Sequence, residues 1–460
     1  MREALRAGRE EGLFEIDEDD EGEREWDDVA QAQLEDANKL MDEGQWGAAS
    51  HAYMSMCRVW PRRGDVRRRA GAALHHARRY REAAVMFRIA ANLPPKPLAA
   101  HLHAAGSLLA LGRDKEACQE YDRVVYHQQA SQSEDVLLTL ELVAAAEKGR
   151  RKATLFKSYI AQAKALIARA PVRVALALSS AAKKAAGQST FDAFSADENR
   201  RASEGNSEQA QDLAAMAQGI APASVLPTVL QVQALLIGGK FREAEVMCMR
   251  ARVPCGHILG DQDGVLHDMY LARELWVLHA RALHLQGRLE SAYELLGEAL
   301  LCDLMDAEAF TEAVMDVHVP DGMEDLAGVP RRLLLSDRER VKQEVKAERR
   351  EIEKLLLARS KADRLASEGS KSTAIHAYSK AMALAPWHDA YIARLVCSRG
   401  YMHLEKNNAT FAVRDATDSL RRRPANNVAS LVLRARAQRI LRHYAEAYAD
   451  YGAALGLMGT

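Results

Sequence analysis

Three stretches of the sequence repeat one pattern at a spacing of 34 residues. Residues 44–54 read GQWGAASHAYM, residues 78–88 read RRYREAAVMFR, and residues 112–122 read GRDKEACQEYD. In each copy an alanine stands five positions after the first residue, and an aromatic residue follows four positions after that alanine. A period of this length, with small and aromatic residues at fixed offsets, predicts an array of helix–turn–helix units that stack on one another.

The same period extends to other parts of the chain. Weaker copies lie near residues 225–258 and 273–306, and three more lie between residues 355 and 460. In the second copy Gly71 lets the two helices approach closely, and Phe87 fills the space to the neighbouring unit. A 34-residue helical hairpin with these positions is a tetratricopeptide repeat (TPR). We therefore predict an all-α fold, a TPR superhelical solenoid whose eight repeats fall in about three clusters.

Breaks in the repeat register divide the chain into parts. Residues 187–224 carry Gly, Ser, Asn and Asp in quick succession, which favours a loop or a mobile insertion. Ser336 and Glu339 have the spacing of a capping box, which predicts that a charged helix begins there. The predicted parts are an acidic N-terminal tail (1–29), a first TPR module of three repeats (30–131), helical hairpins (132–186), a flexible insertion (187–224), a middle TPR module (225–316), a break with a charged linker helix (317–354) and a C-terminal TPR module of three repeats (355–460).

Composition indicates a folded protein without a strong overall charge. The 63 basic and 64 acidic residues nearly cancel, so nothing indicates binding to nucleic acid or to an anionic membrane. The first 28 residues lack the apolar core of a signal peptide, and no stretch approaches the roughly 18 apolar residues that a membrane-spanning helix needs. The six scattered cysteines include no Cys-x-x-Cys pair, which argues against disulfides and zinc. We expect a soluble cytoplasmic protein, with a nuclear location as an alternative.

Motifs of catalysis and ligand binding are missing from the sequence. It contains no Gly-rich phosphate loop, no His-Glu-x-x-His, no Gly-x-Ser-x-Gly and no acidic calcium loop. Neighbouring histidines on a helix point in different directions, so a metal site is disfavoured at His75, His76, His101 and His103. Arginine runs such as residues 421–423 lack the interleaved aromatic residues that stack on bases, which disfavours nucleic acid as a partner. We expect no enzyme activity, no cofactor and no metal.

The last hundred residues carry a more specific pattern. Residues 361–384 are followed by VCSRG at 396–400, AVRDAT at 412–417 and AYADY at 447–451. This module resembles the C-terminal TPR module of the J-domain co-chaperones of DnaJ subfamily C. The resemblance implies stacked TPR clusters, a charged helix before the final module, and partners among heat-shock chaperones or their clients. A J domain works through a His-Pro-Asp tripeptide, which this sequence lacks, so we expect no J-domain activity from these residues.

The resemblance also implies where a carboxylate clamp would lie. Related modules hold a terminal Glu-Glu-Val-Asp with Lys, Asn, Asn, Lys and Arg. At the matching positions the final module has Arg359, Asp363, Ser398, Ala429 and Leu433, and the first module has Leu34, Asn38, Arg69, Ala99 and His103. A reversed charge and two lost donors in the final module mean that a standard clamp is not expected in either module.

The first helix of each repeat is expected to line the concave face of the solenoid. The candidate peptide contacts are therefore Asn38, Arg69, His101, His103, Arg359, Ser398, Arg399 and Arg434. An ordinary solvated role remains open for each of them. The leading hypothesis is a non-catalytic, co-chaperone-like scaffold that binds client or partner proteins. The alternative is a fixed structural subunit of a large multiprotein or ribonucleoprotein complex. The sequence leaves the partners and the oligomeric state open.

Overall fold

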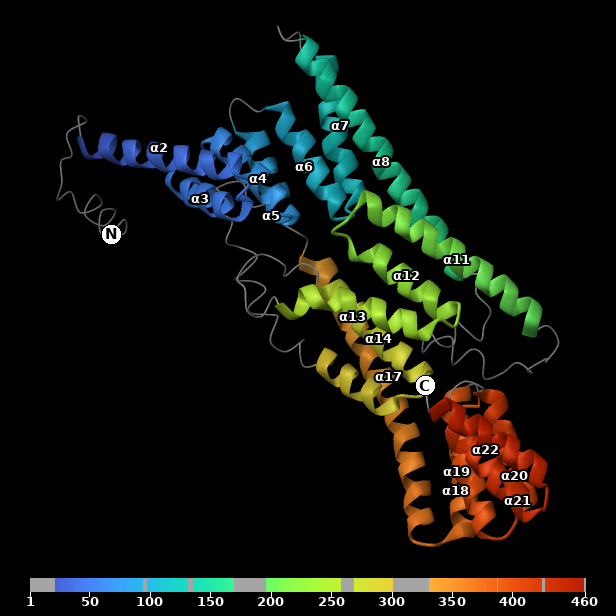
Figure 1. Cartoon of the computed structure of the whole chain (residues 1–460). Coiled ribbons are helices and arrows are strands. Elements are labelled where there is room, and N and C mark those ends of the chain that lie inside the picture. The colour runs from blue at the N-terminus through green and yellow to red at the C-terminus, as the bar shows by residue number, and fades with distance from the viewer. Residues whose placement is uncertain are drawn as a thin grey trace. The chain divides into compact units, whose positions relative to one another are not determined.

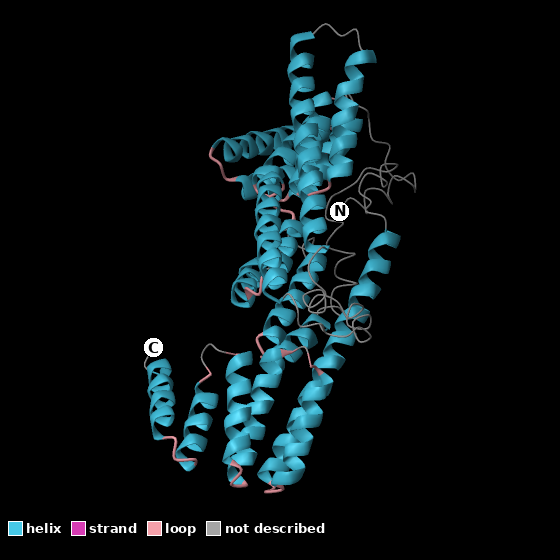
Figure 2. Cartoon of the chain, turned by 90° about the vertical axis from the view of Figure 1, so that its right-hand side faces the viewer, coloured by secondary structure: helices cyan, strands magenta, loops and turns pink. Residues whose placement is uncertain are grey.

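A computed structural model describes most of the chain, and every regular element in the described part is a helix (Figure 2). The all-α prediction is thereby confirmed. The described residues are 21–93, 97–130, 136–168, 196–257, 269–300, 331–386, 388–423 and 427–458. They form two compact units. Unit 1 comprises the described residues within Met1–Lys157 and Ile220–Ser224, and unit 2 those within Ser158–Gly219, Val225–Thr311 and Pro330–Thr460.

Unit 1 is built from consecutive antiparallel helix pairs (Figure 1). The pairs are α2 (Glu21–Asp42) with α3 (Trp46–Val59), α4 (Gly64–His76) with α5 (Tyr80–Asn92), and α6 (Leu98–Ala110) with α7 (Asp114–Ala130). Helix α8 (Val136–Ala168) follows, and its residues up to Lys157 belong to unit 1. The three pairs fall in the three repeats that the 34-residue period predicts. Helix α2 begins at Glu21, inside the stretch predicted as an acidic tail.

Unit 2 continues the same construction. It contains α11 (Ala196–Ile220, except its last residue), α12 (Val225–Ile237), α13 (Phe241–His257), α14 (Met269–Leu285) and a helical segment at 289–300. Helix α17 (Arg331–Ser367) then pairs with α18 (Lys371–Leu384). The last two pairs are α19 (Asp389–Glu405) with α20 (Ala409–Arg422), and α21 (Val428–Ile440) with α22 (Tyr444–Met458).

A left-handed residue closes the turn between the two helices of each repeat. In the described part of the chain, positive φ angles between 61° and 83° occur at Gly44, Arg78, Gly112, Gly239, Gly287, Gly369, Asn407 and Arg442. Each predicted repeat contains one of them. At the first of these turns Gly44 N–H donates to Met41 O at 3.1 Å and Gln45 N–H donates to Leu40 O at 2.9 Å. This pair of bonds satisfies the last carbonyls of a helix and starts the chain back in the opposite direction.

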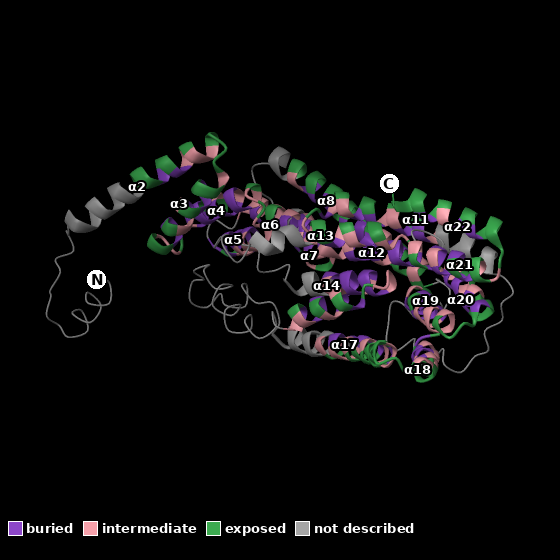
Figure 3. Cartoon of the chain, turned by 60° about the horizontal axis from the view of Figure 1, so that its bottom comes forward, coloured by how far each residue is buried: buried purple, intermediate pink, exposed green. Residues whose placement is uncertain are grey.

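Close approach of the paired helices depends on small residues at the crossing points, as the sequence predicts. A Cβ on Gly71 would lie 2.9 Å from the ring of Phe87, so no larger residue fits there without a shift. The buried positions follow the inner faces of the helices (Figure 3). In unit 1 Tyr53, Met56 and Phe87 are at most 2% exposed. Neighbouring repeats therefore share clusters of buried residues within each unit.

Two local predictions are wrong. The composition of residues 187–224 predicts a loop, whereas residues 196–220 form α11. Ala210, Ala214 and Ala217 lie on one face of this helix and are fully buried, and this packing outweighs the low helix propensity of its Gly, Ser and Asn residues. The capping box fails because α17 begins at Arg331, so Ser336 lies inside the helix.

Helix α17 joins the predicted linker to the C-terminal module without interruption. Val345, Ile352 and Leu355 form its buried stripe, and they pack in one cluster with Val277, Ala280 and Leu283 of α14. One 37-residue helix therefore serves as the linker and as the first helix of the next repeat. Parts of the predicted tail, hairpins, insertion and break, at residues 1–20, 169–195 and 301–330, lie outside the described residues.

Candidate functional site

Arg359, the one cation at the clamp positions of the final module, is already engaged within the chain. Its guanidinium forms an ion pair with Glu290, and its Nε lies 3.7 Å from Asp363 Oδ2. Only 12% of its side chain is exposed. Asp363 in turn accepts a hydrogen bond of 2.7 Å from the Tyr378 hydroxyl, and burial together with this carboxylate raises the pKa of Tyr378. The clamp positions therefore do not present an open cation to a ligand.

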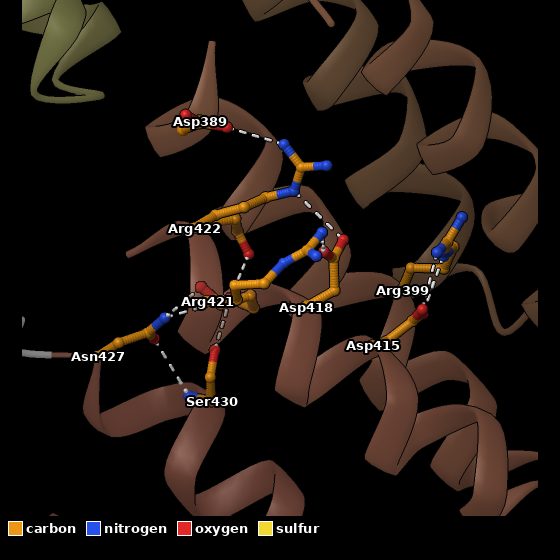
Figure 4. A network of polar contacts seen from close by, with 10 residues as sticks. Asp389, Arg399, Asp415, Asp418, Arg421, Arg422, Asn427 and Ser430 are labelled. Carbon is orange, nitrogen blue, oxygen red and sulfur yellow. Dashed lines mark hydrogen bonds and ion pairs between the residues drawn. The ribbon is translucent and has the colours of Figure 1, made fainter. Parts of the chain in front are cut away.

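Two other predicted contacts, Arg399 and Arg434, are each held by an aspartate of the same repeat. Arg399 Nε and Nη2 donate to Asp415 at 2.9 and 2.7 Å (Figure 4). Arg434 makes the same two-point contact with Asp450, with both distances 2.7 Å, and this hydrogen bonding raises the pKa of Arg434. In both pairs the aspartate stands 16 residues after the arginine. This geometry favours a structural role for both arginines.

Two of the three arginines in the run at residues 421–423 are also held by aspartates. Arg422 donates to Asp389 at 2.8 Å and to Asp418 at 3.2 Å, and Arg421 donates to Asp418 at 3.0 Å (Figure 4). Asn427 lies beside this network and caps α21 by accepting a hydrogen bond of 3.3 Å from Ser430 N–H. Most of the charge in the run is thus neutralised inside the module.

A different set of arginines in the C-terminal module lacks such partners. Helix α19 carries Arg394, Ser398 and Tyr401 on one face, and α21 carries Arg436 on the corresponding face with Arg439 beside it. We call these five residues the cationic face. Within the described part of the chain, no hydrogen bond or ion pair holds the guanidinium groups of its three arginines, which are all exposed.

Contacts between α19 and α21 hold the two halves of the cationic face together. The Tyr401 hydroxyl donates to Ala429 O at 3.3 Å, across the two helices. Burial raises the pKa of Tyr401, and the nearby charge of Arg436 works against that rise. No acidic residue occurs from 390 to 404 in α19 or anywhere in α21. These two helices therefore contribute only positive charge to the cationic face, which suits it to an acidic ligand.

Glu290 shows how a carboxylate behaves at the edge of this surface. Burial acts to raise the pKa of Glu290, but the hydrogen bond from Arg359 and the charges of Arg359 and Arg394 outweigh it and lower that pKa. The side chain of Glu290 is half exposed. The charge of Arg394 thus adds to that of Arg359 in favouring the anionic form of a neighbouring carboxylate.

The candidates of the first module do not form one site. Asn38 and Arg69 come together, because Asn38 Oδ1 accepts hydrogen bonds of 2.6 Å from Arg69 Nη1 and from the Tyr53 hydroxyl. His103 stacks on Phe87, with ring centroids 5.2 Å apart. His101 lies apart from them and contacts buried Glu120 at 2.8 Å, where Arg88 and Arg123 also converge. Leu34, at a clamp position, is buried in the core.

Two partly covered histidines in the first module, His75 and His103, make its stability sensitive to acid. Burial lowers the pKa of His75 and of His103 below the ordinary 6.5, and nearby charges, including Arg68 beside His103, add to the effect. A group with a lowered pKa binds fewer protons in the folded state than in the unfolded state. Its stabilising contribution is present above pH 6.5 and is lost as the pH falls through the lowered value. We therefore expect the melting temperature of unit 1 to fall between pH 7.5 and pH 5, roughly the range in which His titrates.

The measurement is thermal unfolding of the full chain across that pH range. His103→Gln removes one of the two groups, so the melting temperature of this variant is expected to fall less on acidification than that of the wild type. The control is His376→Gln, because His376 lies on α18, outside unit 1. An unchanged acid response in His103→Gln would contradict the assignment.

Two kinds of feature are absent from the described residues, a cluster of metal ligands and a membrane-spanning helix. No group of three or more His, Cys, Asp or Glu side chains in the described ranges could hold a metal ion. Among the same residues, no helix has the length and hydropathy to cross a membrane.

Comparison with known proteins places the fold. The sequence matches no family model and no curated protein. The TPR domain of P58(IPK) has a similar structure, with a TM-score of 0.56 and 17% identity over 93% of this chain and 92% of that chain. Yeast Tom70 aligns over 94% of this chain and 92% of its own with 12% identity, but its TM-score of 0.30 is too low to support an argument. The turns, the helix pairs and the first similarity together show that this chain has a TPR-type helical-repeat fold.

Proposed function

We propose that this protein is a non-catalytic scaffold that binds acidic segments of partner proteins through the cationic face of its C-terminal module. The observation that carries the proposal is the contrast between the two sets of arginines. Arg399 and Arg434 are bound by aspartates, whereas no hydrogen bond or ion pair within the described residues holds the exposed Arg394, Arg436 and Arg439. Among these residues, only the charge of Glu290 acts on Arg394, so an acidic segment from another protein can neutralise the three cations.

The resemblance to DnaJ subfamily C co-chaperones suggests which acidic segment to test first. Heat-shock chaperones end in Glu-Glu-Val-Asp, which offers three carboxylate side chains and a terminal carboxylate. The standard clamp is not preserved, so binding would depend on Arg394 and Arg436 rather than on Arg359. Binding of this peptide would give the protein a co-chaperone-like role, and we propose that it acts in the cytoplasm.

The test is fluorescence anisotropy of labelled Met-Glu-Glu-Val-Asp with the full chain. We expect a dissociation constant of roughly 10–100 µM that rises with salt, as for other small, charge-dominated contacts. The double change Arg394→Glu and Arg436→Glu should weaken binding at least about tenfold, because two attractive charges become repulsive. Arg359→Ala should change the affinity much less, because Arg359 is largely buried against Glu290.

A matched control separates the cationic face from general charge. Arg423→Glu changes an exposed arginine on the same module, at the end of α20 and away from the cationic face. Its affinity should stay within about twofold of the wild type. No saturable binding by the wild type, or a loss in Arg423→Glu as large as the loss in the double variant, would rule out the cationic face as the binding site.

A further inference from the structure

The outer side of the last helix, α22, carries an exposed apolar stripe. Tyr444, Tyr448, Leu455 and Met458 are 64, 83, 69 and 70% exposed. Their spacings of four, seven and three residues place them on one face of the helix, four turns long. We call these four residues the α22 stripe. Single exposed apolar residues are ordinary on protein surfaces, but an aligned set of four is not.

The positions equivalent to Tyr444 and Tyr448 are covered in the preceding repeat. The residues that stand 35 positions before Tyr444 and Tyr448 are Ala409 and Val413 of α20. Ala409 is only 4% exposed, and partly buried Val413 packs in a cluster with Leu433 and Ala437 of α21. Helix α21 therefore covers on α20 the surface that α22 leaves open. The α22 stripe is thus the same kind of surface that neighbouring repeats use to stack on each other.

A partner that covers the α22 stripe must present a helix with an apolar and uncharged face. Helix α22 itself has that chemistry. Its two acidic residues, Glu446 and Asp450, lie off the stripe, and Asp450 is bound to Arg434. Two copies of the stripe can therefore meet without placing like charges against each other. Gly452 and Gly456 lie beside the stripe with no atom within 4 Å of an added Cβ, which leaves room for a second helix to approach.

We propose that the α22 stripe is the contact surface for a second copy of this chain, with two α22 helices packed across a twofold axis. A twofold contact uses the same patch on both copies, and an uncharged apolar stripe is self-complementary in that sense. Four side chains from each copy bury an area near the lower limit for specific interfaces, roughly 1,000 Å² in total. We therefore expect a dimer with a dissociation constant of roughly 10 µM.

The test is sedimentation equilibrium of the full chain up to about 100 µM, a range that brackets this affinity. The wild type should approach twice the 50.8 kDa mass of one chain. Tyr448→Glu places a charge on both sides of the contact and should raise the dissociation constant at least about tenfold. Tyr126→Glu is the matched control, since Tyr126 is 61% exposed on α7, and it should leave the dimer unchanged. A monomeric wild type, or a dimer that Tyr448→Glu does not weaken, overturns the proposal.

Cross-linking fixes which surface makes the contact. Tyr448→Cys, Gly452→Cys and Leu455→Cys place single thiols along the middle of α22. At least one of them should form a disulfide-linked dimer under mild oxidation, because a twofold axis brings equivalent positions within disulfide reach. Gly205→Cys, at an open position on α11, should not do so. A dimer that none of the three α22 thiols cross-links would show that the copies meet elsewhere, or that another protein's helix is the natural occupant, and would overturn the proposal.

Discussion

Asp415→Ala is expected to destabilise the C-terminal repeats by about 3 kcal/mol, because it leaves the guanidinium of Arg399 without its carboxylate partner. Asp415 is 5% exposed and accepts two hydrogen bonds from Arg399, at 2.9 and 2.7 Å. Arg399 also donates to Ser379 Oγ at 3.0 Å, so its head group is fixed between α18 and α20. Removing one member of a buried pair costs more than the pair contributes, since the remaining charge stays desolvated.

Urea unfolding of the full chain, together with hydrogen exchange in α19 and α20, measures this effect. Exchange resolves the affected repeats, because each repeat of a solenoid depends mainly on its neighbours. The double variant Arg399→Met and Asp415→Leu should recover at least half of the loss, because it removes both charges. Arg364→Ala is the control: Arg364 is 73% exposed and pairs with Glu368 at 3.4 Å, so its loss should cost less than about 0.5 kcal/mol. A loss of that small size in Asp415→Ala would mean that water already solvates the Arg399 head group.

The 34-residue period predicted the fold because it reflects which residues pack between helices. It does not depend on the local conformational propensity of the turn residues. Five of the eight turns in the described residues place glycine at the left-handed position, but the other three use Arg78, Asn407 and Arg442. An arginine gives no local signal for positive φ. Those turns are found only because the flanking small and aromatic residues keep the 34-residue register.

The sequence did not predict in which direction each arginine of the candidate site points. Arg394, Ser398 and Arg399 lie within six residues, yet Arg399 points about 100° away from Ser398 around the helix. Its partner, Asp415, stands on the next helix. The signal that was available is the recurrence of an arginine and an aspartate 16 residues apart in two successive repeats, at Arg399 and Arg434. A charge pair that repeats with the structural period indicates a contact inside the repeat.

Gly400→Ala is expected to destabilise the same module by about 2 kcal/mol, although alanine is the better helix former. A Cβ at this position would lie 2.6 Å from Leu433 Cδ2 and 3.2 Å from Asp415 Cβ. Leu433 is fully buried, so its side chain cannot swing into solvent to make room. The added methyl would push α19 away from α21 and disturb the Arg399–Asp415 pair, because Asp415 borders the same site.

The sign of the effect distinguishes this crowding from an ordinary glycine substitution. Gly205→Ala on α11 meets no atom within 4 Å, so it should stabilise the protein by roughly 0.5–1 kcal/mol through backbone entropy alone. Leu433→Val removes the atom that the methyl added by Gly400→Ala would strike. The combination of Gly400→Ala with Leu433→Val should therefore cost less than the sum of the two single changes in urea unfolding. Additive losses would show that α19 and α21 can move apart where they cross. Close packing would then not explain why a glycine stands at position 400.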